Sequence, residues 1–262
     1  MKTFFFLVVS LTASTLGAIC GIGGGVIIRP LLDALHMGSI AEISFLSGCA
    51  VLAMSLYSVC RNLHSRSAGV ELKTGTPLAI GAAFGGVAGK KLFDLAQMAF
   101  SAPAVAGGLQ ATVLAIITLG TLCYVQRKPR IQTLHVQGIL PCVTIGGALG
   151  ALSSFLGIGG GPINLVVLHY YFSMDSKRAA SNSLYIILFS QIASIITAAL
   201  SRTIPECSPA SLCWMIAGGI GGGILGRRIN KKIDNSAVDR MFSAVLLLIA
   251  AISIGNAWKY FS

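Results

Sequence analysis

The chain contains eight long stretches without Asp, Glu, Lys or Arg, and these constrain its fold more than any other feature. They cover residues 3–28, 43–60, 74–89, 95–126, 131–174, 179–201, 207–226 and 241–258. As helices, most of them are long enough to cross the apolar core of a bilayer, which is about 30 Å thick. Charged residues make up only 10% of the chain, too few to cover a surface in contact with water. The sequence therefore predicts an all-α polytopic membrane protein.

The remaining charges are mostly basic and lie between the apolar stretches. The formal net charge is +11, from 19 Lys and Arg against 8 Asp and Glu. Short basic loops mark the cytoplasmic side of inner-membrane proteins. We therefore expect a multi-pass protein of the cell inner (plasma) membrane, surrounded by the lipid bilayer and without a nucleic-acid partner. The Cys and His residues have no ligand-like spacing, so we expect no metal and no cofactor.

The stretch at 131–174 is too long for one crossing, because its 44 residues would extend about 66 Å as a helix. Its predicted break is GIGGG at residues 157–161, followed by Pro162, since Gly disfavours a helix interior and Pro favours a helix start. The first stretch contains the same GIGGG at residues 21–25. A second limb is expected after it, from about residue 26 to residue 36.

The recurrence of GIGGG after 136 residues indicates an internal repeat. Ser47 and Ser183 are separated by the same distance, and GGxxGKK at 85–91 recurs as GGxxGRR at 222–228, at an offset of 137. We therefore expect an N-terminal membrane repeat at residues 1–126, a basic linker at 127–135 and a C-terminal membrane repeat at 136–262. Duplicated halves are common in transporters.

Two topologies fit this repeat. If each GIGGG is a kink within one crossing, the halves are parallel and the loop Lys and Arg divide nine to nine between the two sides. If each GIGGG turns a re-entrant hairpin, followed by three transmembrane helices, the halves are inverted and the division is thirteen to five. The thirteen are Arg61, Arg66, Lys73, Arg127, Lys128, Arg130, Lys177, Arg178, Arg227, Arg228, Lys231, Lys232 and Arg240. The positive-inside rule favours the inverted arrangement, with both termini outside.

The two GIGGG segments and the residues after them resemble the motifs of the sulfite exporter TauE/SafE family of membrane permeases. The first continues as VIIRPLL at 26–32, and the second continues to Asn164 and is followed by KRAASNS at 177–183. The resemblance spans nearly the whole chain and implies transport of sulfite or organosulfur anions. Two residues depart from the family pattern: Arg29 is charged where the family more usually has apolar or polar residues, and Val166 matches the place of Pro30.

The glycine segments are the first candidates for a binding site. A helix that begins inside the membrane presents unpaired N–H groups and a partial positive charge, and glycine lets a ligand approach the backbone. We therefore expect the helix starts to bind an anion through Gly23, Gly24, Gly25, Gly159, Gly160 and Gly161. The alternative is that these glycines only let helices pack closely.

Arg29 is the second candidate. Its guanidinium could clamp the oxygens of sulfite or a sulfonate. Alternatively, Arg29 pairs with Asp33 one turn later or extends to the membrane interface.

Polar residues within the apolar stretches complete the candidates. Four are predicted to donate hydrogen bonds to the same anion: Ser47, Asn164, Asn182 and Ser183. Such residues also join helices to one another. Gln191, Ser194 and Thr197 share a helix face that is either a helix contact or a pore wall. Among the histidines, His169 is the strongest candidate for a proton relay.

No motif for catalysis stands out: the chain lacks a G-x-S-x-G elbow and a complete phosphate loop. We therefore expect a transporter and not an enzyme. A membrane potential that is negative inside expels anions, so an exporter needs no coupling ion. The predicted function is export of sulfite or an organosulfonate, a small sulfur-containing anion. The alternatives are proton-coupled uptake of such an anion or a non-transporting scaffold protein, and a homodimer stays open.

Overall fold

The computed structural model describes residues 2–64, 69–99, 103–156, 158 and 161–261, and within them it contains helices and no strand. The α-helices are α1 (Lys2–Cys20), α2 (Gly25–Ala34), α3 (Ile40–His64), α4 (Leu72–Ala99), α5 (Pro103–Arg127), α6 (Ile139–Phe155), α7 (Pro162–Phe172), α8 (Ser176–Leu200), α9 (Pro209–Lys232) and α10 (Asn235–Phe261). A 3-10 turn at Lys128–Arg130 follows α5. The predicted all-α class is confirmed.

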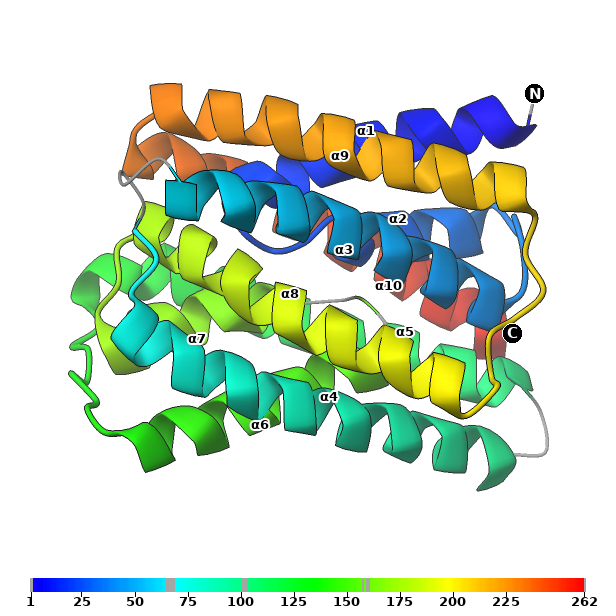
Figure 1. The fold of residues 1–262 in the computed structure, drawn as a ribbon, viewed down its shortest axis with the longest axis horizontal. Coiled ribbons are helices and arrows are strands. Elements are labelled where there is room, and N and C mark those ends of the chain that lie inside the picture. Colours follow the sequence, from blue (N-terminus) through cyan, green and yellow to red (C-terminus); the bar gives the residue numbers. More distant parts are fainter. Residues whose placement is uncertain (1, 65–68, 100–102, 157, 159–160, 262) are drawn as a thin grey trace.

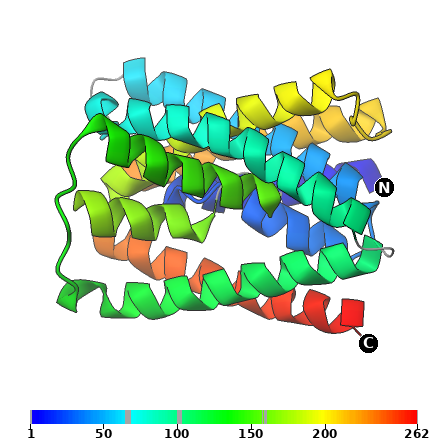
Figure 2. The same ribbon diagram turned by 90° about the horizontal axis from the view of Figure 1, so that it is seen from below.

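The long helices lie along one common direction, and both chain ends lie at the same end of the bundle (Figure 1; Figure 2). Among the described residues, five helices are long and apolar enough to cross a membrane: α3, α5 with its 3-10 turn, α8, α9 and α10. α1 and α6 contain shorter apolar helices. α4, with 28 residues, packs along α6 and α8. This arrangement is that of a multi-pass membrane protein.

The first GIGGG segment turns the chain back on itself between α1 and α2. Gly21 and Gly23 have φ angles of +77° and +76°, which L side chains rarely adopt. A Cβ atom on Gly24 would lie 2.8 Å from Ser14 Oγ and 2.9 Å from Ser14 Cα, so α2 begins directly against the last turns of α1. The expected break and second limb are therefore present, with the limb ending at Ala34.

The second long stretch is also broken, between α6 and α7. Gly157, Gly159 and Gly160 lie outside the described residues, and α7 begins at Pro162 as the sequence predicts. Residues 131–138 form no helix and lie against the end of α7. Leu134 N donates to Tyr170 O at 2.7 Å, and Val136 N donates to Tyr171 O at 2.8 Å. The chain thus enters α6 beside the point where α7 ends.

Glycines bring two pairs of helices into close contact. A Cβ on Gly81, Gly85 or Gly89 of α4 would overlap a carbonyl oxygen of α6. In the other pair, a Cβ on Gly222 of α9 would lie 2.5 Å from Ser14 Cβ of α1. Small residues of this kind let membrane helices approach closely. α4 is thereby fixed to α6, and α9 to α1.

Polar contacts tie several helix termini together at one end of the bundle. Lys128, after α5, lies 3.1 Å from Asp239 of α10 and donates to Ser176 of α8 at 2.7 Å. Arg227 of α9 donates to Asn62 Oδ1 of α3 at 2.9 Å. Most of the thirteen Lys and Arg residues that the inverted arrangement places on one side of the membrane lie on these termini. We therefore call this end of the bundle the basic end.

Candidate functional site

Two large cavities lie at opposite ends of α3 and α8. The first has a volume of about 470 Å³ and is lined by residues from the end of α3, the start of α8 and the end of α9. The second, of about 380 Å³, is lined by residues from the start of α3, the ends of α4 and α6, and the end of α8. We call the first the basic cavity and the second the hydroxyl cavity.

The two cavities are built from equivalent positions of the predicted repeat. At an offset of 136, the matching lining residues are Ala18 and Ser154, Ser58 and Ser194, Asn62 and Ala198, Gly69 and Pro205, Ala180 and Ser44, and Leu184 and Gly48. At an offset of 137, Arg227 matches Lys90 and Asn230 matches Phe93. Positions that line the basic cavity in one predicted half therefore line the hydroxyl cavity in the other predicted half.

The cavities differ in chemistry although their positions match. The basic cavity is lined by Lys177, Arg178, Arg227 and Lys231, with Asp175 as its acidic residue. Several of these charges already have contacts: Arg178 lies 3.6 Å from Glu71, and Arg227 Nη2 donates to Arg61 O at 2.9 Å. A cavity with this excess of positive charge concentrates anions.

The hydroxyl cavity contains one lysine, Lys90, and a set of polar uncharged side chains. These are Ser44, Ser153, Ser154, Gln191, Ser194 and Thr203. Ser44 Oγ and Ser154 Oγ are buried and have no hydrogen-bond partner among the described residues. Gln191 and Ser194 therefore face a cavity, whereas Thr197 Oγ1 donates back to Ala193 O of its own helix at 2.8 Å.

The structure brings the two glycine segments together. A Cβ on Gly25, the first residue of α2, would overlap the carbonyl oxygen of Ile158 in the second segment. One on Gly21 would overlap Ala180 of α8, which lines the basic cavity. At Gly161, the residue before α7, a Cβ would make only ordinary van der Waals contacts with the described residues, the nearest being Ile158 Cδ1 at 3.4 Å. Close packing thus explains Gly21, Gly24 and Gly25, while Gly161 needs another reason.

Ser47, Asn164 and Ser183 lie buried in the interior of the bundle. Asn164 Nδ2 donates to Ser183 Oγ at 3.4 Å, and both Asn164 Oδ1 and Ser47 Oγ lack a partner within the described chain. Ser47 precedes Gly48 of the hydroxyl cavity, and Ser183 precedes Leu184 of the basic cavity. Ser47 is therefore next in sequence to the lining of one cavity, and Ser183 is next to the lining of the other.

Asn182 has a different environment from its neighbour Ser183. Its Nδ2 donates to Gly69 O at 2.5 Å and to Arg178 O at 2.9 Å, and its Oδ1 accepts from Glu71 N at 3.0 Å. All of these partners are backbone groups. Asn182 thus holds the segment before α4 against α8.

Arg29 is 8% exposed and lies in neither large cavity. Its Nη2 donates to Gln110 Oε1 of α5, and Gln110 Nε2 donates to Phe155 O at the end of α6 at 2.6 Å. Arg29 Nη1 has no partner among the described residues and borders a cavity of about 30 Å³, which is large enough for a water molecule. The Asp33 carboxylate instead accepts a hydrogen bond from Tyr260 OH, and the alternative of an Arg29–Asp33 pair does not form.

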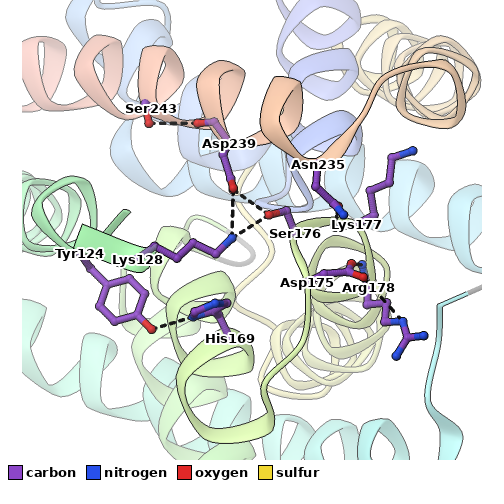
Figure 3. A network of polar contacts seen from close by, with 10 residues as sticks. All are labelled: Tyr124, Lys128, His169, Asp175, Ser176, Lys177, Arg178, Asn235, Asp239 and Ser243. Carbon is purple, nitrogen blue, oxygen red and sulfur yellow. Dashed lines mark hydrogen bonds and ion pairs between the residues drawn. The ribbon is translucent and has the colours of Figure 1, made fainter. Parts of the chain in front are cut away.

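A network of ionisable residues at the basic end was not found from the sequence. Figure 3 shows Lys128 between Asp239 and Ser176, with Tyr124 and His169 beside them. Tyr124 OH lies 2.8 Å from His169 Nδ1. The sequence does contain a signal for these residues: Tyr124 and Tyr260 are separated by the repeat distance of 136 residues, as are Asp33 and His169.

An all-helical bundle of apolar membrane helices with cavities at opposite ends is the architecture of membrane transporters, which move solutes across membranes. The chain belongs to the sulfite exporter TauE/SafE family, whose family model matches residues 6–253. A curated relative, the "Probable membrane transporter protein YunE" of Bacillus subtilis, is 24% identical over 277 residues, covering 95% of this chain and 96% of the relative. No solved structure matches the chain. The resemblance seen in the sequence is thereby confirmed, and the protein is a membrane transporter of this family.

Proposed function

We propose that this transporter exports a small sulfur-containing oxyanion, sulfite or an organosulfonate, across the cell inner membrane. The observation that carries the proposal is the pair of cavities lined by equivalent positions of the repeat at opposite ends of α3 and α8. If the halves are inverted repeats, exchanging their conformations closes one cavity and opens the other. The matching contacts of α4 with α6 and of α9 with α1 support the same relation.

The charge difference between the cavities supports an anion as substrate and export as the direction. Moving one charge across 100 mV is worth about 2.3 kcal/mol, and an inside-negative potential drives anions outward. With the basic end in the cytoplasm, the basic cavity collects anions from the cell. The hydroxyl cavity, with Lys90 as its lining cation, then releases them.

The anion would be held between the cavities by backbone and side-chain donors. The starts of α2 and α7 supply N–H groups with partial positive charge, and Asn164, Ser47 and Ser183 supply side-chain donors beside them. Arg29 reaches the anion only if its small cavity widens, because about 30 Å³ does not accommodate sulfite. We therefore assign the first contacts to the helix starts and the interior hydroxyl and amide groups.

The decisive substitution is Gly161→Ala, because the structure has room for the added methyl group. If an anion approaches the backbone at the start of α7, the methyl group blocks it and flux falls by about tenfold or more, the cost of one lost hydrogen bond to a charged group. Sulfite flux into or out of proteoliposomes, with an imposed potential, measures this. Gly120→Ala is the matched control, since a Cβ there meets nothing within 4 Å.

Normal abundance with lost flux in Gly161→Ala supports the anion site. Unchanged flux in this variant contradicts a backbone site at α7. An absence of flux for sulfite, sulfoacetate and sulfate in the unsubstituted protein contradicts the proposed substrate class. Gly24→Ala does not separate these readings, because its Cβ would overlap Ser14 and disturb the fold in either case.

A further inference from the structure

The two short limbs α2 and α7 each end beside an ionisable side chain that is bound by a tyrosine. Tyr260 OH of α10 donates to Asp33 Oδ1 at 2.6 Å, and Tyr124 OH of α5 lies 2.8 Å from His169 Nδ1. Tyr124 and Tyr260 are 136 residues apart, as are Asp33 and His169. The same contact therefore occurs twice. In one, a tyrosine of the first predicted half contacts the second half, and in the other, a tyrosine of the second half contacts the first.

These two contacts lie at opposite ends of the bundle. Tyr124 and His169 lie next to the network of Lys128 at the basic end (Figure 3). Tyr260 and Asp33 lie where α10 ends, and Lys259 Nζ there donates to Ala34 O at 3.3 Å. At each end of the molecule, a titratable side chain thus lies where a short limb ends.

We propose that Asp33 and His169 bind and release protons during the transport cycle, so that anion movement is coupled to proton movement. This inference rests on the proposed function, since it adds a coupling ion to the same transporter. The sequence alone favoured uncoupled export, because no proton-carrying carboxylate stood out. The structure provides one, Asp33, held by Tyr260 and by Asn256 Nδ2 at 3.4 Å.

Protonation weakens the tyrosine contact in both places. The Asp33 carboxylate accepts a charge-assisted hydrogen bond from Tyr260, and a proton on the carboxylate removes that charge. His169 accepts from Tyr124 in the tautomer that carries its hydrogen on Nε2, and a proton on Nδ1 ends its role as acceptor. The proton comes from solvent in each case and the tyrosine keeps its own. A proton therefore loosens a short limb of one half from a long helix of the other.

Charged and polar side chains surround both groups. Asp33 lines a small cavity together with Arg29 of its own helix and with Asn256 and Tyr260 of α10, and Lys259 of α10 donates to Ala34 O, next to Asp33 in the chain. Around His169, the cavity of about 20 Å³ is lined by Tyr124, Lys128, Cys20 and Asp239, and Tyr170 is adjacent in the chain. Lys128 and Asp239 are 3.1 Å apart. Burial, and next the cation of Lys128, lower the pKa of His169, while Asp239 raises it by less, so this state favours the neutral imidazole that accepts from Tyr124.

A purely structural contact explains these pairs less well. Any donor and acceptor would join the helices, yet the acceptor is ionisable in both repeats and differs in type. Imidazole also titrates in the physiological range, as a coupling site requires.

The test is sulfite flux in proteoliposomes with the potential held at zero by potassium and valinomycin. An imposed gradient, with about pH 6 on one side and about pH 8 on the other, then supplies the driving force. We expect flux in the unsubstituted protein to follow this gradient and the gradient-driven part to be lost in Asp33→Asn and His169→Gln. Both substitutions keep a hydrogen-bond acceptor for the tyrosine. Because sulfite itself changes protonation near neutral pH, each variant is compared with the unsubstituted protein in the same buffers.

The matched controls are Glu42→Gln, at the same end as Asp33, and His135→Gln, at the same end as His169. We expect both to respond to the gradient as the unsubstituted protein does. Flux that responds to the membrane potential but not to the pH gradient overturns the inference and leaves the proposed function intact. An unaltered pH response in Asp33→Asn and His169→Gln overturns it as well.

A second measurement does not depend on the substrate. A cysteine at Ser58 in the basic cavity or at Ser194 in the hydroxyl cavity, in a chain with its own cysteines replaced, reports opening through its reaction with a maleimide. Each reactivity is divided by that of the unfolded chain at the same pH, which removes the pH dependence of the thiolate itself. Coupling predicts that pH changes the two corrected reactivities in opposite directions, and that Asp33→Asn and His169→Gln abolish this change. Corrected reactivities that do not change with pH overturn the inference even if no transported anion is found.

Discussion

Substituting alanine for single glycines tests how the helices are held together. A Cβ on Gly85 of α4 would overlap the carbonyl oxygen of Gly147 in α6, and a backbone atom cannot rotate away. Overpacking costs about 1–3 kcal/mol, and alanine regains about 1 kcal/mol through its helix propensity. We expect a net loss of up to about 2 kcal/mol in the free energy of unfolding for Gly85→Ala.

The equivalent substitution in the second repeat, Gly222→Ala, should cost less. The nearest atom to its Cβ would be Ser14 Cβ at 2.5 Å, a looser contact than at Gly85. Gly120→Ala and Gly255→Ala are the controls, because their Cβ atoms would meet nothing within 4 Å. These controls should gain up to about 1 kcal/mol from helix propensity alone.

Thermal unfolding in detergent measures these differences through a thiol-reactive dye. Cys20 and Cys142 are buried, at 0% and 3% exposure, and become reactive when the bundle opens. Overpacking separates Gly85→Ala from Gly120→Ala by about 1–3 kcal/mol. At roughly 2–4 °C per kcal/mol, Gly85→Ala should unfold about 2–12 °C below Gly120→Ala, with Gly222→Ala between them. Equal midpoints for Gly85→Ala and Gly120→Ala would refute the close contact of α4 with α6.

Two further predictions concern polar contacts. Asn182→Ala removes three hydrogen bonds to backbone groups and should lower the free energy of unfolding by about 1–3 kcal/mol. Asn182→Asp should cost at least as much, because its buried carboxylate would face the carbonyl oxygens of Gly69 and Arg178. The same dye assay measures both, and unchanged stability in Asn182→Ala would contradict the contact. Lys128→Met leaves Asp239 without its cation and should cost more than the double substitution Lys128→Met with Asp239→Leu, because the double variant leaves no unpaired charge; a double variant less stable than Lys128→Met would contradict this.

The breaks in the chain could be predicted from the sequence because they depend on local conformation. Glycines at 21 and 23 adopt positive φ angles, and Pro162 begins α7, as their residue types favour. Residues 131–138 show the limit of counting charges. They are free of Asp, Glu, Lys and Arg, yet their backbone groups bond to the end of α7 and form no helix.

The site could be predicted only in part, because its contacts join distant segments. Arg29 binds Gln110, which is 81 residues away, whereas the sequence could suggest only Asp33 as a local partner. Asn182 and Ser183 are adjacent in sequence, yet the first binds backbone groups of the α4 segment and the second faces Asn164. Charge, polarity and spacing select candidates, while packing decides which of them share a cavity.

The divergence between equivalent positions fits the proposed export. A transporter with identical halves would present identical cavities, and it would bind its anion equally well from either side. Here Lys177 and Asn230 line one cavity, whereas Ala41 and Phe93 line the other at the matching positions, and Ser181 corresponds to Phe45. The greater positive charge at the basic end raises the local anion concentration there. This difference cannot change the equilibrium set by the membrane potential, but it favours loading at the basic end and release at the hydroxyl end. Exchanging Lys90 and Arg227 by glutamine, one at a time, should therefore lower the rate of loading more for Arg227→Gln than for Lys90→Gln, as measured by the concentration dependence of flux started from the basic side.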